Sequence, residues 1–362
     1  MSVPVIGMVG GGQLARMTHQ AAIALGTSLH VLAASPEESA ALVAATVTIG
    51  DHDSFDDLRH FATDVDILTF DHEHVPQEHL QALVAAGVMV RPSPDALVHA
   101  QDKRLMRQRM AALGVPVPRW SDNADELPRP YVAKAVRGGY DGRGVWVVDD
   151  RDELPPTDLI FEERVPIVRE LAAQVARSPS GQAAAYPVVE TVQVNGICRE
   201  VIAPAPGLND ETAVAIQRLA LTIADELDIT GMLAVELFET ADGVLVNELA
   251  MRPHNSGHWT IEGARTSQFE QHLRAVADLP LGDTTPTATY TVMANILGGE
   301  DPDVAGRLTH VLARDPGVRV HLYGKAARPG RKLGHVTVLG DDLDVVRQRA
   351  GEAAAYLRGE PG

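Results

Sequence analysis

The chain has 362 residues, 45% hydrophobic and 22% charged, with a formal net charge of −18. This length exceeds what one hydrophobic core usually holds, so two or three packed domains are expected. The negative charge argues against nucleic acid as a partner, because neutralising a polyanion needs a basic face. No run reaches the roughly 20 apolar residues of a membrane span, and MSVPVIGMVGGGQL lacks a signal-peptide pattern, so we expect a cytoplasmic protein with no membrane partner.

Strands and helices alternate over residues 1–95. Apolar runs predict strands at 3–9, 28–33, 47–49, 66–70 and 88–91, and helical spacing predicts helices at 13–25, 35–45, 54–62 and 76–86. Gly26 stands where a helix is expected to end. This alternation predicts a parallel, doubly wound sheet.

The pattern changes from about residue 96. A polar helix at 95–113 leads to the breaker cluster at 114–118. Short strands follow at 131–136, 144–148, 159–163, 171–177 and 184–192, then a helix at 212–227 and a strand pair at 233–238 and 244–249. The region 288–362 combines strands with one terminal helix, 342–358. Three domains are therefore expected, at 1–95, 96–287 and 288–362.

A glycine-rich turn follows the first strand. Gly10-Gly11-Gly12-Gln13-Leu14-Ala15 matches the dinucleotide-binding pattern G-x-G-x-x-G/A between a strand and a helix. The acid expected at the end of the second strand is missing, because Ala33-Ala34-Ser35 stands there. Three interpretations stay open: a tight turn that needs glycine, an anion site at the helix N-terminus, and an NAD site.

A second glycine cluster follows a lysine. Lys134 lies in an alternating strand pattern, and Gly138-Gly139-Tyr140-Asp141-Gly142-Arg143-Gly144 comes four residues later. A strand lysine can neutralise phosphate oxygens while the N–H groups of the loop close over them. The alternative is a surface hairpin with an exposed lysine, in which Asp141 is an ordinary turn residue.

Two glutamates are expected to face each other across a hairpin. Thr240-Ala241-Asp242-Gly243 is a turn sequence, and a hairpin folded there makes Glu236 and Glu248 cross-strand partners about 5 Å apart. Like charges so placed repel unless a cation lies between them, and carboxylate oxygens suit Mg²⁺. Asn247 alternates to the other face unless a bulge redirects it. The alternative is two solvated glutamates.

The order of lysine strand, glycine flap and carboxylate hairpin is typical of ATP-grasp enzymes. Within that superfamily, the chain resembles the 5-(carboxyamino)imidazole ribonucleotide synthase family over nearly its whole length. The blocks that carry this resemblance are Gly10–Leu14, Phe70–Val75, Gly138–Gly144, Asn247–Ala250, Arg252–Trp259, Gly324-Lys325 and Arg328–His335.

The resemblance implies an ATP-grasp fold of mixed α/β and α+β type. A Rossmann-like N-terminal domain would precede a two-lobed ATP-binding region, with a mobile lobe at about 118–192, and a small C-terminal domain. The implied activity is the ATP-dependent carboxylation of 5-aminoimidazole ribonucleotide by bicarbonate in purine biosynthesis. ATP and Mg²⁺ or Mn²⁺ are the implied cofactors, and a homodimer is the implied assembly.

The resemblance also implies roles for individual residues. The ATP contacts would be Lys103, Lys134, Gly139, Tyr140, Asp141, Gly142, Arg143, Gly144, Glu162, Glu163, Arg164, Val165, Glu170, Gln193, Asn247 and Glu248. Within this set, the lysines would hold phosphates, residues 162–165 would form the hinge that binds adenine, and Glu170 would bind the ribose. The metal ligands would be Glu236 and Glu248.

A second set would serve the ribonucleotide and bicarbonate. The substrate contacts would be Gly12, Gln13, Glu73, Arg252, His254, Asn255, Ser256, Lys325 and Arg331, and the catalytic residues Tyr140, Asp141, Arg143, His254 and Asn255. Lys325 and Arg331 would hold the 5′-phosphate. Asp71 stands where the family usually has glutamate, so Glu73 is preferred as the contact.

Simpler explanations exist for two of these blocks. His254 and His258 could be ordinary loop histidines, and the cations between 325 and 332 could be a solvated stretch. Three other functions compete with the implied one: a different ATP-grasp ligase, such as a formate-dependent ribonucleotide transformylase, an NAD-dependent oxidoreductase built on the first glycine loop, and an inactive ligand-binding regulator.

Overall fold

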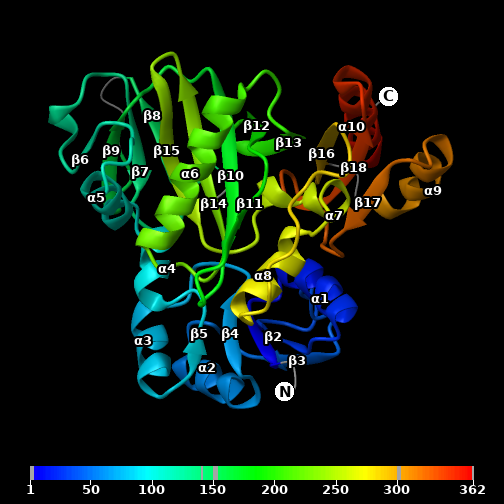
Figure 1. Ribbon diagram of the computed structural model, residues 1–362, viewed down its shortest axis with the longest axis horizontal. Coiled ribbons are helices and arrows are strands. Elements are labelled where there is room, and N and C mark those ends of the chain that lie inside the picture. The colour runs from blue at the N-terminus through cyan, green and yellow to red at the C-terminus, as the bar shows by residue number, and fades with distance from the viewer. Residues whose placement is uncertain (1–3, 140–141, 150–153, 300–302, 361–362) are drawn as a thin grey trace.

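The computed structural model describes residues 4–139, 142–149, 154–299 and 303–360. These residues form three sheets of five, nine and four strands with helices packed around them (Figure 1). Within these described ranges, no helix is long and apolar enough to cross a membrane.

The N-terminal sheet is parallel and has the strand order β3-β2-β1-β4-β5. Its strands are β1 (Ile6–Val9), β2 (Leu29–Ala33), β3 (Thr46–Ile49), β4 (Ile67–Phe70) and β5 (Met89–Val90). Its helices are α1 (Gln13–Leu25), α2 (Phe55–Phe61), the short η1 (Ala62–Asp64) and α3 (Gln77–Ala85). The predicted parallel sheet is confirmed, and so is the helix 13–25 that ends before Gly26.

The helix predicted at 35–45 is wrong, because this segment forms turns. Glu38 accepts the main-chain N–H groups of Gly11 and Ala34, both at 3.1 Å. The N–H of Ala40 donates to the carbonyl of Gly11 at 2.8 Å. The segment therefore bonds to the glycine loop instead of to its own backbone.

The single helix predicted at 95–113 is also wrong, since Asp102 divides it into α4 (Pro94–Gln101) and α5 (Lys103–Ala112). Asp102 has an extended backbone, with φ −128° and ψ 108°, and its side chain accepts the N–H of Leu105 as a cap. Its other oxygen binds Arg137, just after β7, at 3.0 Å. This break fixes where α5 begins, and hence where Lys103 stands.

The largest sheet combines strands of the middle region of the chain with strands of the C-terminal region. Its order is β15-β14-β10-β12-β13-β16-β18-β17, with β11 paired to β10. The strands are β10 (Arg169–Arg177), β11 (Ala183–Ala185), β12 (Val189–Val194), β13 (Ile197–Ala203), β14 (Gly231–Thr240), β15 (Gly243–Ala250), β16 (Tyr290–Leu297), β17 (Arg319–Leu322) and β18 (Lys332–Gly340). The single strand predicted at 184–192 is wrong, because β11 and β12 are separate.

Helices cover this sheet. They are α6 (Asp210–Glu226), the short η3 (Asn255–Gly257), α7 (Thr260–Gly263), α8 (Gln268–Val276), α9 (Val304–Arg314) and α10 (Leu343–Arg358). The prediction of one helix after residue 288 was incomplete, since α9 lies there as well as α10.

A smaller antiparallel sheet has the order β6-β9-β7-β8 and lies beside the β15 edge of the large sheet (Figure 1). Its elements are β6 (Trp120–Ser121), the short η2 (Ala124–Glu126), β7 (Tyr131–Ala135), β8 (Val145–Val148) and β9 (Leu159–Glu163). The strands β10 to β12 belong to the large sheet, so the separate sheet is shorter than the lobe expected at 118–192. The domain boundaries at 95 and 287 stay predictions.

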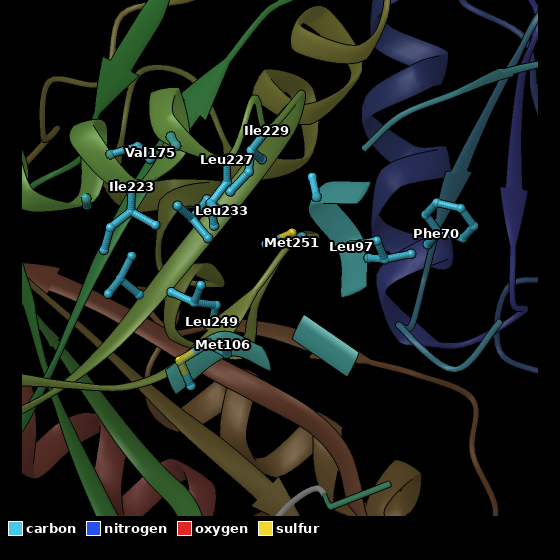
Figure 2. Close-up of a cluster of buried hydrophobic side chains, with 14 of the residues drawn as sticks. Phe70, Leu97, Met106, Val175, Ile223, Leu227, Ile229, Leu233, Leu249 and Met251 are labelled. Carbon is cyan, nitrogen blue, oxygen red and sulfur yellow. The ribbon is translucent and has the colours of Figure 1, made fainter. Parts of the chain in front are cut away.

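One hydrophobic cluster joins the N-terminal sheet to the large sheet. Figure 2 shows Phe70 and Leu97 on one side and Leu233, Leu249 and Met251 on the other, and all belong to the same buried cluster. Burying each such side chain contributes roughly 1.5–3 kcal/mol. The end of β4 and the end of β15 are therefore held close together.

Candidate active site

The hairpin of β14 and β15 places Glu236 directly opposite Glu248, as predicted. A β-bulge follows, because Leu237 pairs with Val246 and leaves Asn247 as an extra residue. The side chain of Asn247 consequently reaches the same site, and its Oδ1 accepts a hydrogen bond from Lys134 at 2.8 Å. Of the two alternatives for Asn247, the bulge is the one observed.

Two lysines from different elements meet this hairpin. Lys103, the first residue of α5, places its Nζ 2.9 Å from Glu248 Oε1. Lys134 on β7 lies 2.8 Å from Glu162 Oε2. Burial works to raise the pKa of Glu248, but the two ammonium groups outweigh it and lower that pKa. Glu248 is therefore ionised beside the predicted phosphate-binding lysines.

A buried arginine that sequence reasoning missed supports the bulge. Arg107 is fully buried and binds Glu162 at 2.6 Å. It also donates to the carbonyl oxygens of Val246 at 3.3 Å and Asn247 at 2.9 Å. The stretch KRLMRQRM offers no signal that distinguishes this arginine from its neighbours. The Glu162 side chain, predicted to contact adenine, thus binds two cations, Arg107 and Lys134.

Glu236 lies among other acids and one histidine. Burial raises the pKa of Glu236, and the charges of Glu248 and Glu170 add to the rise. Burial also raises the pKa of Glu170 to about 7, with Glu248 contributing. Two carboxylates that share one site favour a bound cation, and Mg²⁺ takes few protein carboxylates and fills its remaining positions with phosphate oxygens and water. The pair therefore fits a Mg²⁺ site.

Protein carboxylates fill the N-terminal glycine loop. Asp71, at the end of β4, accepts the N–H of Gly12 at 2.9 Å and the N–H of Ala15 at 2.7 Å. Glu38 takes the N–H of Gly11. The loop N–H groups that an external anion or a dinucleotide would use are therefore bound to the protein's own carboxylates, which agrees with the tight-turn interpretation. Asp71 is a residue that sequence reasoning set aside in favour of Glu73.

Several predicted substrate contacts meet beyond the ends of β1 and β4 in the N-terminal sheet. Glu73 binds Arg252 at 2.6 Å and accepts the N–H of Met251 at 3.2 Å. Lys325, in the loop after β17, donates to the side chain of Gln13. The structure thus brings together residues that lie up to 312 positions apart.

The basic block at 325–332 is only partly arranged as expected. Arg331 donates to the carbonyl of Ala326 in its own loop at 3.2 Å. Lys332, at the start of β18, instead acts electrostatically on Glu236 and His254. Lys332 belongs to the basic block seen in the sequence, but it was not among the predicted substrate contacts.

His254 contacts one of the two paired carboxylates. Its Nε2 lies 3.2 Å from Glu236 Oε1, and its Nδ1 lies 2.8 Å from Ser256 Oγ. Burial, with the charges of Arg252 and Lys332, lowers the pKa of His254 to about 3, so the imidazole is neutral. Asn255 forms two hydrogen bonds with Asn295, at 3.0 and 2.8 Å, so its side-chain amide is engaged within the protein.

The remaining predicted ATP contacts come from three segments of the chain. The end of β9 and the residues after it supply Glu163, Arg164 and Val165. On β12, Gln193 lies where the pairing with β13 shifts its register. The flap supplies Gly139, Gly142, Arg143 and Gly144. A Cβ added to Gly196 would lie 2.8 Å from the Cα of Gly142, so the flap touches the β12–β13 turn. Tyr140 and Asp141 lie outside the described residues.

Fold and site together define an ATP-grasp enzyme. Three family models match the chain: a ribonucleotide synthetase preATP-grasp domain at residues 3–101, an ATP-grasp domain at 103–269, and a phosphoribosylaminoimidazole carboxylase C-terminal domain at 291–349.

Curated relatives and solved structures agree on the family. N5-carboxyaminoimidazole ribonucleotide synthase of Mycobacterium tuberculosis is 59% identical, over 98% of this chain and 88% of the relative. The Corynebacterium ammoniagenes protein of the same name is 48% identical, over 98% and 92%. The synthetase structure from Thermus thermophilus has a TM-score of 0.88 at 37% identity, over 99% of both chains. The Aspergillus clavatus synthase, solved with ADP and 5-aminoimidazole ribonucleotide, has a TM-score of 0.90 at 29% identity, over 98% of both chains. The chain therefore belongs to the N5-carboxyaminoimidazole ribonucleotide synthase family.

Proposed function

We infer that this chain is the ATP-dependent ligase that carboxylates the exocyclic amine of 5-aminoimidazole ribonucleotide with bicarbonate in purine biosynthesis. The observation that carries the inference is the meeting of Lys103, Lys134 and Asn247 at the paired carboxylates Glu236 and Glu248. In such a site the lysines can bind the phosphates of a triphosphate while the carboxylates bind its metal ion.

The reaction requires two changes of bonding. An oxygen of bicarbonate bonds to the γ-phosphorus of ATP as ADP leaves, which yields carboxyphosphate. The exocyclic amine then bonds to the carboxyl carbon, directly or after release of CO₂, while phosphate leaves and the amine loses a proton. Lys134 and the flap N–H groups neutralise charge on the transferred phosphoryl group, and a closed flap keeps water from carboxyphosphate.

Glu236 and Glu248 are the proposed ligands of Mg²⁺ or Mn²⁺. When bound there, the ion neutralises the phosphate oxygens during transfer. Lys103 lies against Glu248. A phosphate bound by Lys103 would therefore lie beside this proposed metal ligand.

The second substrate is assigned to the edge of the N-terminal sheet. We propose that Glu73, Arg252 and His254 face the aminoimidazole and bicarbonate, and that Lys325 and Arg331 bind the 5′-phosphate. Lys325 supports this assignment, because it lies beside Gln13 and acts on the carboxyl of Asp71.

A cytoplasmic homodimer completes the proposal. Exposed apolar side chains gather on α1 and the segment after β2, namely Ile23 at 68%, Leu42 at 53% and Val43 at 44% exposure. Covering such side chains favours association. Light scattering coupled to gel filtration tests this, since a monomer at micromolar concentration contradicts it.

The decisive experiment measures ADP release in the presence of Mg²⁺. Release should rise strongly when 5-aminoimidazole ribonucleotide and bicarbonate are both present, with little response to formate or NADH. A stimulation by formate in place of bicarbonate would move the assignment to a formate-dependent transformylase. Product identity is checked by the incorporation of ¹³C from labelled bicarbonate into the ribonucleotide.

A further inference from the structure

Two buried glutamines hold the loop that carries His254. Gln268, on α8, accepts the main-chain N–H of His254 with Oε1 at 2.8 Å and donates Nε2 to the main-chain carbonyl of His254 at 2.8 Å. Gln268 is 0% exposed and Gln174, on β10, is 2% exposed. Since one amide binds both main-chain groups of His254, the backbone there has a defined position.

Gln174 acts on the side chain of the same histidine through Ser256. Its Nε2 donates to Ser256 Oγ at 3.0 Å, and Ser256 Oγ lies 2.8 Å from His254 Nδ1. A Cβ added to Gly257 would lie 2.4 Å from Gln174 Nε2 and 2.4 Å from Gln268 Oε1. The two amides therefore enclose Gly257, and the loop has no room to move between them.

These contacts also select a tautomer. The main-chain N–H of Ser256 donates to His254 Nδ1 at 3.4 Å, so Nδ1 acts as an acceptor. A neutral imidazole has one acceptor nitrogen and one N–H group. The hydrogen-bond network thus places the hydrogen on Nε2, which lies 3.2 Å from Glu236.

We propose that Gln268 and Gln174 are positioning residues, which fix the location and the tautomer of His254 so that its Nε2–H points to Glu236. This inference rests on the proposed function, because that function puts His254 in the active site. Neither glutamine belongs to the sequence blocks that carry the family resemblance.

The same helix offers a matched control. Gln271 is also 0% exposed. Its amide binds Gly282 in the same two-point manner, donating to the carbonyl at 2.9 Å and accepting the N–H at 2.7 Å. Gly282 is no part of the proposed site, so loss of this amide changes stability without changing the position of His254.

The experiment compares Gln268→Met with Gln271→Met, since methionine has a similar length and lacks the amide. Both variants should lose a similar amount of stability in urea unfolding. Only Gln268→Met should lower kcat, by about 100-fold, because small displacements of catalytic groups cost this much. KM for ATP should stay within about twofold, since the lysine contacts are untouched.

The outcomes separate this inference from the proposed function. A wild-type protein without ribonucleotide- and bicarbonate-dependent ADP release would overturn the proposed function itself. An active wild type in which Gln268→Met and Gln271→Met have equal kcat would overturn the positioning role alone. If Gln268→Met does not fold, Gln174→Met replaces it in the test. The ¹⁵N chemical shifts of His254 in Gln174→Met should show loss of the single tautomer. An unchanged tautomer together with an unchanged kcat would overturn the inference.

Discussion

Replacing Arg107 with methionine removes the buried guanidinium that supports the bulge of β15. Methionine has a similar length but no charge. In the structure, Arg107 binds Glu162 at 2.6 Å and the carbonyl of Asn247 at 2.9 Å. The substitution leaves Lys134, 2.8 Å away, as the remaining cation beside Glu162.

The expected loss of stability follows from the burial of this ion pair. Removing one partner of a buried pair costs about 3–5 kcal/mol. Because Lys134 still compensates Glu162, we expect the lower end, about 3 kcal/mol in the free energy of unfolding. Without Arg107, the main chain of Asn247 is no longer held in place, and Asn247 is the hydrogen-bond acceptor of Lys134. KM for ATP should therefore rise by about 10-fold, equivalent to about 1.4 kcal/mol.

Equilibrium urea unfolding, followed by tryptophan fluorescence, measures the first effect. Trp120 is a suitable reporter, since it pairs with Glu162 between β6 and β9. Arg104→Met is the matched control on the same helix. Arg104 binds Asp122 at 2.6 Å and Asp158 at 2.7 Å, and both carboxylates are exposed. Exposed pairs contribute little, so this variant should unfold nearly as the wild type does.

Two results would refute the reasoning about Arg107. An equal loss of stability in Arg104→Met would mean that burial does not distinguish the two arginines. An unchanged KM for ATP in a folded Arg107→Met protein would mean that the bulge does not depend on the guanidinium.

Three further predictions concern Glu248, Arg331 and the buried His272. Glu248→Gln should lower turnover by orders of magnitude, and it should destabilise the protein because Lys103 loses its carboxylate; near-normal turnover at limiting Mg²⁺ would remove Glu248 from the metal site. Arg331→Ala should raise KM for the ribonucleotide by roughly 10- to 150-fold, the equivalent of about 1.5–3 kcal/mol, and a rise in KM for ATP instead would contradict the division of the site. Burial lowers the pKa of His272 from 6.5 to about 3, so its stabilising effect is complete above pH 6.5 and is lost as the pH falls towards 3. The difference in unfolding free energy between wild type and His272→Gln should therefore shrink by about 2 kcal/mol between pH 7 and pH 5, and a difference that stays constant would show that His272 titrates normally.

Local patterns predicted helices whose hydrogen bonds stay within the helix. The helix 13–25 is amphipathic and ends at Gly26, which adopts φ 65°. The segment 35–45 has helical spacing too, but Glu38 and Ala40 bond to Gly11, which lies 27 residues from Glu38. Such a long-range competitor leaves no trace in the local pattern.

In the candidate site, too, local features could be predicted and long-range contacts could not. The pairing of Glu236 with Glu248 could be predicted, because the turn between their strands determines the register. The bulge that redirects Asn247 stayed one of two alternatives, because Arg107, which binds the Asn247 carbonyl, lies 140 residues away in the chain and gives no local signal. The contacts of Gln268 with His254 could not be predicted either, because they depend on how α8 packs against the loop that carries His254.

The large sheet has a consequence for how the protein can be divided. β16 pairs with β13 from Glu200–Ala294 to Ala203–Thr291, so the C-terminal strands continue the sheet of the ATP-grasp region. A chain truncated before β16 would leave β13 as an open edge, and Ile202 would lose the C-terminal hydrophobic cluster that buries it. Unpaired edge strands with apolar side chains promote aggregation. The C-terminal region is therefore expected to be inseparable from the catalytic core in expression experiments, although family models treat the two as separate modules.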